Sequence, residues 1–351
     1  MPRLVRLTAL ACLLTAAMLA RAEEGAAAGL CYRGINLSGA EYGKRGGVVG
    51  TDYIYPSEET IRYFADKGMN AVRLPFRWER LQPRLGEPLS EEELLLLRQA
   101  VGLARKAGMT VILDPHNYAK YDERTIGTPD VPVSAFADFW RRVAAEFAAD
   151  HGIVFGLMNE PYDIDGPAWV AAANEAVAAI RETGATNLVL VPGTIWSGGA
   201  TWFDEKPWGS NAGVMTGFRD PANHYAFEIH QYLDVDYSGK HATCEKADEV
   251  NDRLLRLSDW MRQNGSRAFL GEFGGSKDPA CLAGLSRLGR MMADNSDVWI
   301  GWTYWAAGEW WPEEEPLNIQ PRPGKGTPAQ LEALKAALDG PADPDRCLPG
   351  H

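Results

Sequence analysis

The chain of 351 residues carries 47 acidic and 35 basic side chains, a formal net charge of −12, and 46% of its residues are hydrophobic. This length and composition are typical of one large globular domain and exclude a disordered or low-complexity chain. The acidic balance repels nucleic acids and anionic membranes, so we expect neither as a partner and expect a monomer with a neutral or cationic substrate.

The first 22 residues have the pattern of a secretory signal peptide. Arg3 and Arg6 precede an apolar run, Leu7–Leu19, and Ala20–Ala22 places small residues at the cleavage positions. A membrane anchor is the alternative, but the run is shorter than the ~18 residues or more that span a bilayer. We therefore predict that residues 1–22 are removed and that the mature protein is secreted or periplasmic.

Eight short stretches rich in β-branched and aromatic residues alternate with helical patterns along the rest of the chain. The predicted strands are Tyr32–Leu37, Ala71–Leu74, Thr110–Asp114, Ile153–Asn159, Leu188–Val191, Tyr225–His230, Ala268–Glu272 and Val298–Tyr304. Helices are predicted between them, for example over Val133–Ala149 and over Ser90–Ala107, where Ser90 and Glu93 have the spacing of a capping box. Eight such units predict a single (β/α)8 TIM barrel over residues 23–351, with any active site at the carboxyl ends of the strands.

The segment after the fifth predicted strand departs from this pattern. Thr194–Asn223 lacks helical periodicity and carries Trp196, Trp202 and Trp208 among glycines. We expect a long functional loop at the top of the barrel that forms a binding surface, with a short helix inside it as the alternative.

Two predicted strands run directly into a glutamate. Glu160 follows Ile153–Asn159, and Glu272 ends Ala268–Glu272. A charge directly after a buried strand is unfavourable unless the protein uses it, and two carboxyl groups about 5–5.5 Å apart are what retaining glycoside hydrolysis requires. Because the fourth and seventh strand ends face each other across a barrel mouth, the pair predicts a glycosidase.

Further polar and aromatic side chains follow the ends of the predicted strands, where the barrel places its chemistry. They are Arg73, His116, Asn117, Asn159, His230, Tyr232 and Trp305. A phosphate cradle over Gly271–Ser276 is disfavoured because Glu272 would repel the ligand. A metal hydrolase is disfavoured because the six histidines offer no pair with ligand spacing, so we expect no metal and no cofactor.

With these residues the sequence resembles glycoside hydrolase family 5, and within it the secreted endo-β-1,4-glucanases best known from fungi. The motifs that carry the resemblance are Asn159-Glu160-Pro161, the Glu272 segment, Ile35–Glu41, Asp114–Tyr118 and His230–Cys244. The resemblance implies a (β/α)8 enzyme that hydrolyses internal β-1,4-glycosidic bonds by double displacement, with Glu160 as acid/base and Glu272 as nucleophile. Unlike the fungal pattern, the chain shows no linker to a cellulose-binding module.

The supporting residues have expected roles within this chemistry. Arg73 and Tyr232 are expected to donate to Glu272, and His230 to lie near Glu160. Among the sugar-binding residues, Asn159 would bind the 2-hydroxyl and Trp305 would form the floor. The polar pair His116 and Asn117 and the loop tryptophans Trp196 and Trp202 complete the expected substrate-binding set, with packing of the loop as the alternative for each tryptophan.

The expected substrate is β-1,4-glucan, but the same constellation also serves β-mannan, mixed-linkage glucan and xyloglucan. A non-catalytic glycan-binding barrel is the alternative from another class, and the presence of both carboxylates disfavours it.

Four cysteines remain after removal of the signal peptide, which permits two disulfides and three connectivities. Cys244 and Cys281 belong to the catalytic end of the predicted barrel, whereas Cys31 and Cys347 belong to the opposite end. The predicted pairs are therefore Cys244–Cys281 and Cys31–Cys347, with one pair of buried free thiols as the alternative.

Overall fold

Eight strands pair in parallel and close into a barrel in the order β1-β10-β9-β8-β7-β6-β3-β2, which confirms the predicted fold. The computed structural model describes residues 29–340 and 342–348, so the predicted signal peptide over residues 1–22 lies outside the described residues. The barrel strands are β1 (Tyr32–Leu37), β2 (Ala71–Phe76), β3 (Thr110–Pro115), β6 (Ile153–Gly156), β7 (Val189–Pro192), β8 (Tyr225–His230), β9 (Ala268–Glu272) and β10 (Trp299–Ala307).

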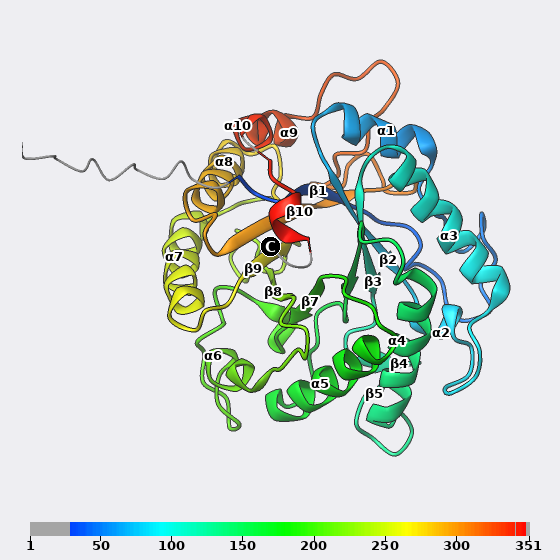
Figure 1. Ribbon diagram of the computed structural model, residues 1–351. Helices are drawn as coiled ribbons and strands as arrows, with labels where there is room; N and C mark the ends of the chain where they lie inside the picture. The colour runs from blue at the N-terminus through cyan, green and yellow to red at the C-terminus, as the bar shows by residue number, and fades with distance from the viewer. Residues whose placement is uncertain (1–28, 341, 349–351) are drawn as a thin grey trace, which may run out of the picture.

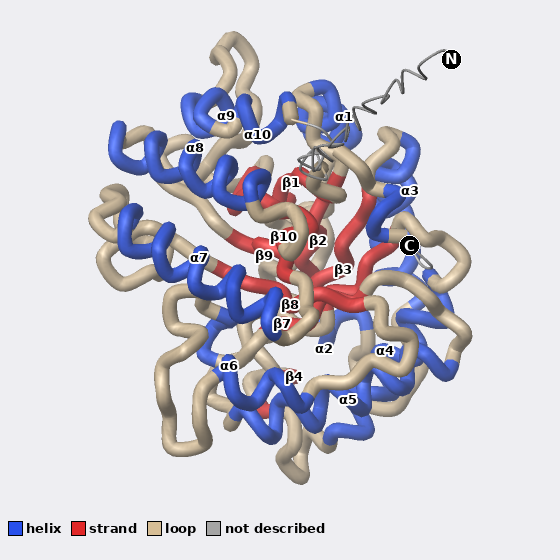
Figure 2. Tube along the Cα trace, turned by 60° about the vertical axis from the view of Figure 1, so that its left-hand side comes forward, coloured by secondary structure: helices blue, strands red, loops and turns tan. Residues whose placement is uncertain are grey.

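Helices surround this barrel on the outside, as Figures 1 and 2 show from two directions. They are α1 (Glu58–Asp66), α2 (Trp78–Leu81), α3 (Glu91–Lys106), α4 (Val133–Phe147), α5 (Gly166–Glu182), α6 (Asn211–Val214), α7 (Ala247–Gln263), α8 (Pro279–Asp294), α9 (Ala329–Ala333) and α10 (Lys335–Asp339). A two-stranded hairpin, β4 (Lys120–Tyr121) and β5 (Arg124–Thr125), lies in the loop after β3. In the part of the chain that the structure describes, no helix combines the length and the apolar character needed to cross a bilayer.

Only half of the capping box predicted for α3 forms. The Ser90 hydroxyl accepts a hydrogen bond from the backbone N–H of Glu93, as expected for an N-cap. The side chain of Glu93 does not return to Ser90; it accepts hydrogen bonds from Tyr53, Tyr55 and Arg80. The tertiary ion pair with Arg80 thus replaces the local contact.

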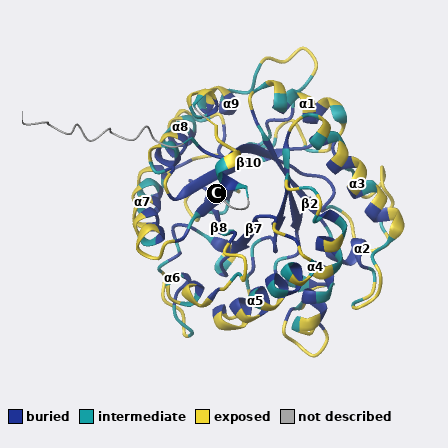
Figure 3. Cartoon of the chain, in the orientation of Figure 1, coloured by how far each residue is buried: buried dark blue, intermediate teal, exposed yellow. Residues whose placement is uncertain are grey.

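The barrel interior has an apolar layer below and a polar layer above. The apolar layer contains Tyr32, Ala71, Ile112, Val154, Leu190, Ala226, Phe269 and Ile300, and strands and helices bury a second apolar core between them (Figure 3). Because side chains alternate along a strand, the position two residues after Ala71 also faces the interior, and it holds Arg73. On β3 and β8 the equivalent upper positions hold Asp114 and Glu228, both buried. Charge is therefore built into the barrel just below its carboxyl-terminal mouth.

The fifth unit has no long helix, as predicted. Between β7 and β8 the chain forms two 3₁₀ turns, Ile195–Ser197 and Met215–Gly217, and the single-turn helix α6. The alternative of a short helix in this loop is thus also confirmed.

Two disulfides join the predicted partners. Cys31 bonds to Cys347 below β1, with a Cα–Cα distance of 6.1 Å, and Cys244 bonds to Cys281 at the start of α8, with a Cα–Cα distance of 5.0 Å. Both predicted connectivities are confirmed, and the alternative of a free thiol pair is wrong.

Candidate active site

Glu272, the last residue of β9, is buried and held by two hydrogen-bond donors and a third, longer contact. Arg73 Nη1 lies 3.0 Å from its Oε1, and the Tyr232 hydroxyl donates to its Oε2 at 2.8 Å. His230 Nδ1 lies 3.5 Å from the same Oε2. Donors of this kind favour the ionised carboxylate and fix its direction, which suits a nucleophile.

Glu160 lies across the barrel mouth from Glu272 and is more exposed. Its side chain is 17% exposed, against 5% for Glu272, and its Oε1 is 2.8 Å from His230 Nδ1. One carboxylate oxygen of each glutamate lies within 4.8 Å of the other, close to the ~5–5.5 Å separation of retaining glycosidases. The backbone φ of Glu160 is +40°, a strained value for a non-glycine residue that is common at functional sites.

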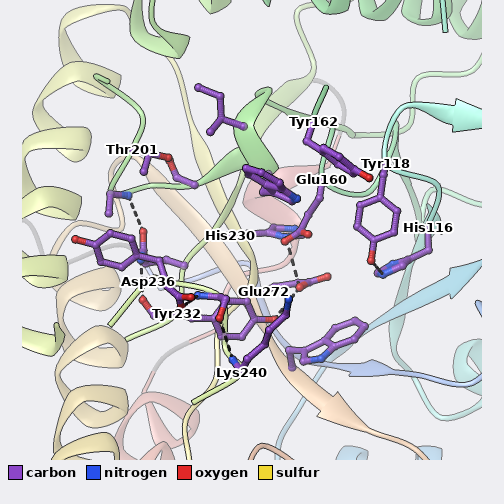
Figure 4. Close-up of a pocket in the computed structure, with 18 residues that line it drawn as sticks. His116, Tyr118, Glu160, Tyr162, Thr201, His230, Tyr232, Asp236, Lys240 and Glu272 are labelled. Atoms are coloured by element: carbon purple, nitrogen blue, oxygen red, sulfur yellow. Dashed lines mark hydrogen bonds and ion pairs between the residues drawn. The ribbon is translucent and has the colours of Figure 1, made fainter. Parts of the chain in front are cut away.

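His230 joins the two glutamates, as Figure 4 shows, and its ring is also 3.2 Å (Nε2 to Oε1) from Glu228. Burial alone lowers the pKa of His230, but the charge of Glu272 and the hydrogen bonds to Glu160 and Glu228 outweigh it and raise the pKa to about 10. The ring is therefore an imidazolium at neutral pH, with both of its N–H groups directed at carboxylates.

The raised pKa of His230 predicts a pH-dependent stability. Protonation of His230 stabilises the folded protein. This contribution to the free energy of unfolding is fully present below the ordinary pKa of 6.5 and is lost as pH rises through about 10. The decrease in the free energy of unfolding between these two pH values, measured with urea, should be a few kcal/mol larger in the wild type than in His230→Gln. Equal losses in the two proteins would contradict the imidazolium.

Arg73 is fully buried beneath the glutamates and orders the polar layer. Its Nη2 donates to Asn159 Oδ1 at 2.9 Å, and its Nη1 lies 3.0 Å from Asp114 Oδ2. Asp114 in turn contacts His116 Nδ1 at 2.8 Å, and His116 Nε2 lies 3.2 Å from Asn159 Nδ2. Burial raises the pKa of Asp114, but Arg73 and His116 outweigh it and lower the pKa. The Asp114 carboxylate thus accepts a hydrogen bond from His116 Nδ1. The other ring nitrogen, Nε2, is then the acceptor for Asn159 Nδ2.

Trp305 supplies an aromatic face beside this network. Its ring stacks on His116 with centroids 5.5 Å apart and an interplanar angle of 17°. Both rings line a cleft of about 700 Å³ that also contains Glu160, Glu272 and His230. The structure therefore brings both predicted glutamates and the predicted floor residue into one cavity.

Four residues of the predicted set do not line this cleft: Arg73 and Asn159 lie beneath it in the polar layer, and Trp202 and Asn117 are buried elsewhere. Trp202 is fully buried and packs against Phe227 and Trp260, with ring centroids 6.0 and 5.9 Å apart, so the expectation that it contacts substrate is wrong. Asn117 is also buried, and its amide accepts from the backbone N–H of Trp78 and donates to Glu79. Its expected contact with substrate is wrong as well, because these bonds use the side chain to hold the loop after β3.

Trp196, in contrast, is 50% exposed and lines the cleft. It stacks face to face on Tyr162, with centroids 5.0 Å apart and an interplanar angle of 9°. Lys120 Nζ lies 4.4 Å from the Tyr162 ring centroid and donates to the Tyr162 hydroxyl at 3.1 Å.

Several residues of the site were missed by sequence reasoning. The cleft is also lined by Tyr118, Tyr162, Gln231, Asp236, Tyr237 and Lys240. Tyr118 and Tyr162 follow His116 and Glu160 by two positions, a proximity that pointed to them. The residues Asp236–Lys240 lie inside the segment His230–Cys244 that carries the family resemblance, but no pattern singled them out within it, and Glu228 was hidden inside an apolar strand.

Comparison with known proteins agrees with this geometry. The family model Cellulase (glycosyl hydrolase family 5) matches residues 28–308. Endo-beta-1,4-glucanase B of Emericella nidulans is 33% identical over 89% of this chain and 93% of its own. Among solved structures, the endo-beta-1,4-glucanase Xac0029 of Xanthomonas axonopodis pv. citri is 48% identical, with a TM-score of 0.86 over 88% of this chain and 98% of its own.

A second solved structure, XacCel5A in complex with cellopentaose, is 45% identical, with a TM-score of 0.86 over 88% of this chain and 99% of its own. The family model covers most of the chain, and the likeness extends over the barrel and its mouth. On these grounds the chain belongs to glycosyl hydrolase family 5.

Proposed function

We propose that the protein is a retaining endo-β-1,4-glucanase with Glu272 as nucleophile and Glu160 as acid/base. The observation that carries the proposal is the pair of carboxylate oxygens within 4.8 Å of each other in unlike surroundings. Glu272 receives Arg73 and Tyr232, whereas Glu160 has its contact with His230 and is more exposed. The names of the relatives support β-1,4-glucan as the substrate.

The reaction follows from these positions. Glu272 attacks the anomeric carbon while Glu160 gives its proton to the departing glycosidic oxygen, which leaves a glycosyl ester on Glu272. Glu160, now a carboxylate, takes a proton from water, and this water attacks the anomeric carbon and frees Glu272. The configuration at the anomeric carbon is inverted twice and therefore retained.

The cleft supplies the contacts that a sugar chain needs. Asn159 is buried behind the lining residue His116, which its Nδ2 contacts at 3.2 Å, so the proposed bond to the sugar 2-hydroxyl would use the second N–H of Nδ2. Trp305 offers its face to the C–H surface of the cleaved sugar. The stacked pair Trp196 and Tyr162 extends the aromatic surface beyond Glu160, which suits an enzyme that holds several sugars and cleaves internally.

Export from the cytoplasm is part of the proposal. The signal-peptide pattern of residues 1–22 and the two disulfides support it, because disulfides persist in oxidising compartments.

Product analysis tests the proposed function. The protein should release reducing ends and short oligosaccharides from soluble β-1,4-glucan, faster than from β-mannan or xyloglucan, and the first product seen by proton NMR should carry the β configuration. Faster cleavage of another polysaccharide would reassign the substrate. Initial α product would overturn double displacement, and binding without cleavage would identify a glycan-binding barrel.

The two tryptophans of the long loop should respond differently to truncation. Trp196→Ala is expected to weaken binding of cello-oligosaccharides by about 1–2 kcal/mol with little change in melting temperature, because the ring is half exposed over the cleft. Trp202→Ala should instead cost about 3–5 kcal/mol of stability, since it removes a fully buried ring. Calorimetric titration with cellopentaose and thermal melts measure both; the opposite pattern would contradict the assignment.

A further inference from the structure

Glu228 lies inside the barrel, directly beneath the proposed catalytic residues. It is two positions before His230 on β8, and strand alternation turns both side chains inward while Phe227 and Ile229 face the surrounding helices. The side chain of Glu228 is only 1% exposed, so substrate does not touch it. The proposed reaction does not use this carboxylate.

The contacts of Glu228 join two residues of the site. Its Oε1 lies 2.9 Å from Arg73 Nε and 3.2 Å from His230 Nε2. The Arg73 contact is an ion pair without a hydrogen bond, because the N–H of Nε does not point at the oxygen. Oε2 has no hydrogen-bond partner among the described residues. Burying a carboxylate with one oxygen unpartnered is unfavourable for folding, so packing alone is a poor reason for its presence.

The neighbouring strand leaves room for this carboxylate. A Cβ atom at Gly271, on β9, would lie 2.3 Å from Glu228 Oε1 and 2.8 Å from its Cγ. Glycine at this position thus permits the Glu228 side chain to reach Arg73 and His230.

Glu228 also changes the charge balance of the site. The charged and titratable groups around it are Arg73 on β2, Asp114 on β3 and His116 after it, Glu160 after β6, His230 on β8 and Tyr232 after it, and Glu272 on β9. Its negative charge lies beside the cations Arg73 and His230, and the hydrogen bond from the His230 ring to Glu228 raises the pKa of that ring.

We propose that Glu228 is a positioning residue: acting through His230 and Arg73, its carboxylate orients both side chains and keeps both ring nitrogens of His230 protonated beside the glutamates at neutral pH. This inference rests on the proposed function. His230 receives Glu228 at Nε2 and Glu160 at Nδ1, so its ring transmits the charge of Glu228 to the acid/base. Loss of that charge should release the ring proton of His230 at lower pH.

Glu228→Gln tests the proposal because it keeps the shape and removes the charge. We expect kcat on soluble β-1,4-glucan to fall about tenfold or more with KM nearly unchanged, since substrate does not touch the residue. The basic limb of kcat/KM against pH should move about one unit to lower pH. Glu228→Asp, which keeps the charge, should restore the basic limb of the wild type.

Glu93→Gln is the matched control. Glu93 is also buried and pairs with an arginine at the same distance, 2.9 Å between Oε1 and Arg80 Nε, but it lies outside the site. It should lower stability and leave the pH profile in place. A folded Glu228→Gln protein with the profile and kcat of the wild type would overturn the proposal, as would an equal pH shift in Glu93→Gln.

A measurement on the unaltered protein covers the case in which Glu228→Gln does not fold. With ¹⁵N-labelled histidine, NMR at neutral pH should show both ring nitrogens of His230 protonated, and a neutral ring would overturn the proposal. Failure of the proposed function is recognised separately, by a Glu272→Ala protein that turns over as fast as the wild type. If Glu272→Ala is inactive and Glu228→Gln behaves as the wild type, only the role of Glu228 is wrong.

Discussion

Replacement of Glu272 by alanine is expected to abolish turnover on every substrate, with kcat lowered by about 10⁴-fold or more. The reason is that no other carboxylate among the described residues can take its place: Glu160 lies on the leaving-group side, and Glu228 is buried beneath the site. Reducing-end assays on soluble β-glucan and release of the chromophore from an aryl cellobioside measure the loss.

Glu160→Ala separates the two roles. Without its acid the enzyme should lose most activity on polysaccharide, but an aryl glycoside whose leaving group needs no protonation should still form the glycosyl ester on Glu272. Pre-steady-state release of the aryl group should therefore show a burst, and added azide should speed the second step by attacking the ester. A burst in Glu272→Ala and none in Glu160→Ala would reverse the assignment. Melting curves of both variants establish that they fold.

Much of the site could be predicted because, in a parallel barrel, the position of a residue along its strand determines at which end of the barrel it lies. Each strand is buried, so a polar residue at its carboxyl end stands out against apolar neighbours, and all eight ends meet at one mouth. Glu160 and Glu272 are 112 positions apart (272 − 160), yet both lie close to the same atom, His230 Nδ1. Glu160 Oε1 is 2.8 Å from it and Glu272 Oε2 is 3.5 Å from it.

The errors arise where packing between distant segments determines the environment of a side chain. Trp196 and Trp202 are the same residue type in the same loop, but one is half exposed and the other is fully buried against Trp260 of α7. No local pattern separates them. Glu93 has the spacing of a capping box, and Arg80 captures its side chain instead. Tertiary contacts override local preference in both cases.

Glu228 was missed for a different reason. A single acidic residue within an apolar strand reads as an outward-facing surface position, unless its alternation with His230 is noticed. Glu228 and His230 are two positions apart on one strand, so the sequence alone places their side chains on the same face. What was absent was the knowledge that Arg73 lies opposite, which only the closed barrel supplies.

Removal of the two disulfides should have large and unequal effects on stability. Cys31 and Cys347 are 316 positions apart, and closing so long a loop contributes on the order of 5 kcal/mol in the chain-entropy model. Cys244 and Cys281 are 37 positions apart, for which the same model gives about 3–4 kcal/mol. Urea unfolding of the two double Cys→Ser variants should therefore show the greater loss for the Cys31–Cys347 pair.

Kinetics should show the opposite order, because the two bonds lie at opposite ends of the barrel. Cys244 ends the loop after β8 whose residues Asp236 and Lys240 line the cleft, and its bond ties that loop to α8. The Cys244–Cys281 variant should raise KM for cello-oligosaccharides several-fold, by releasing a wall of the cleft. The Cys31–Cys347 variant, assayed where it is still folded, should keep the KM and kcat of the wild type. If it instead raised KM, the lower end of the barrel would have to influence the mouth, and the polar layer above Ala71 and Ile112 would be the path to examine.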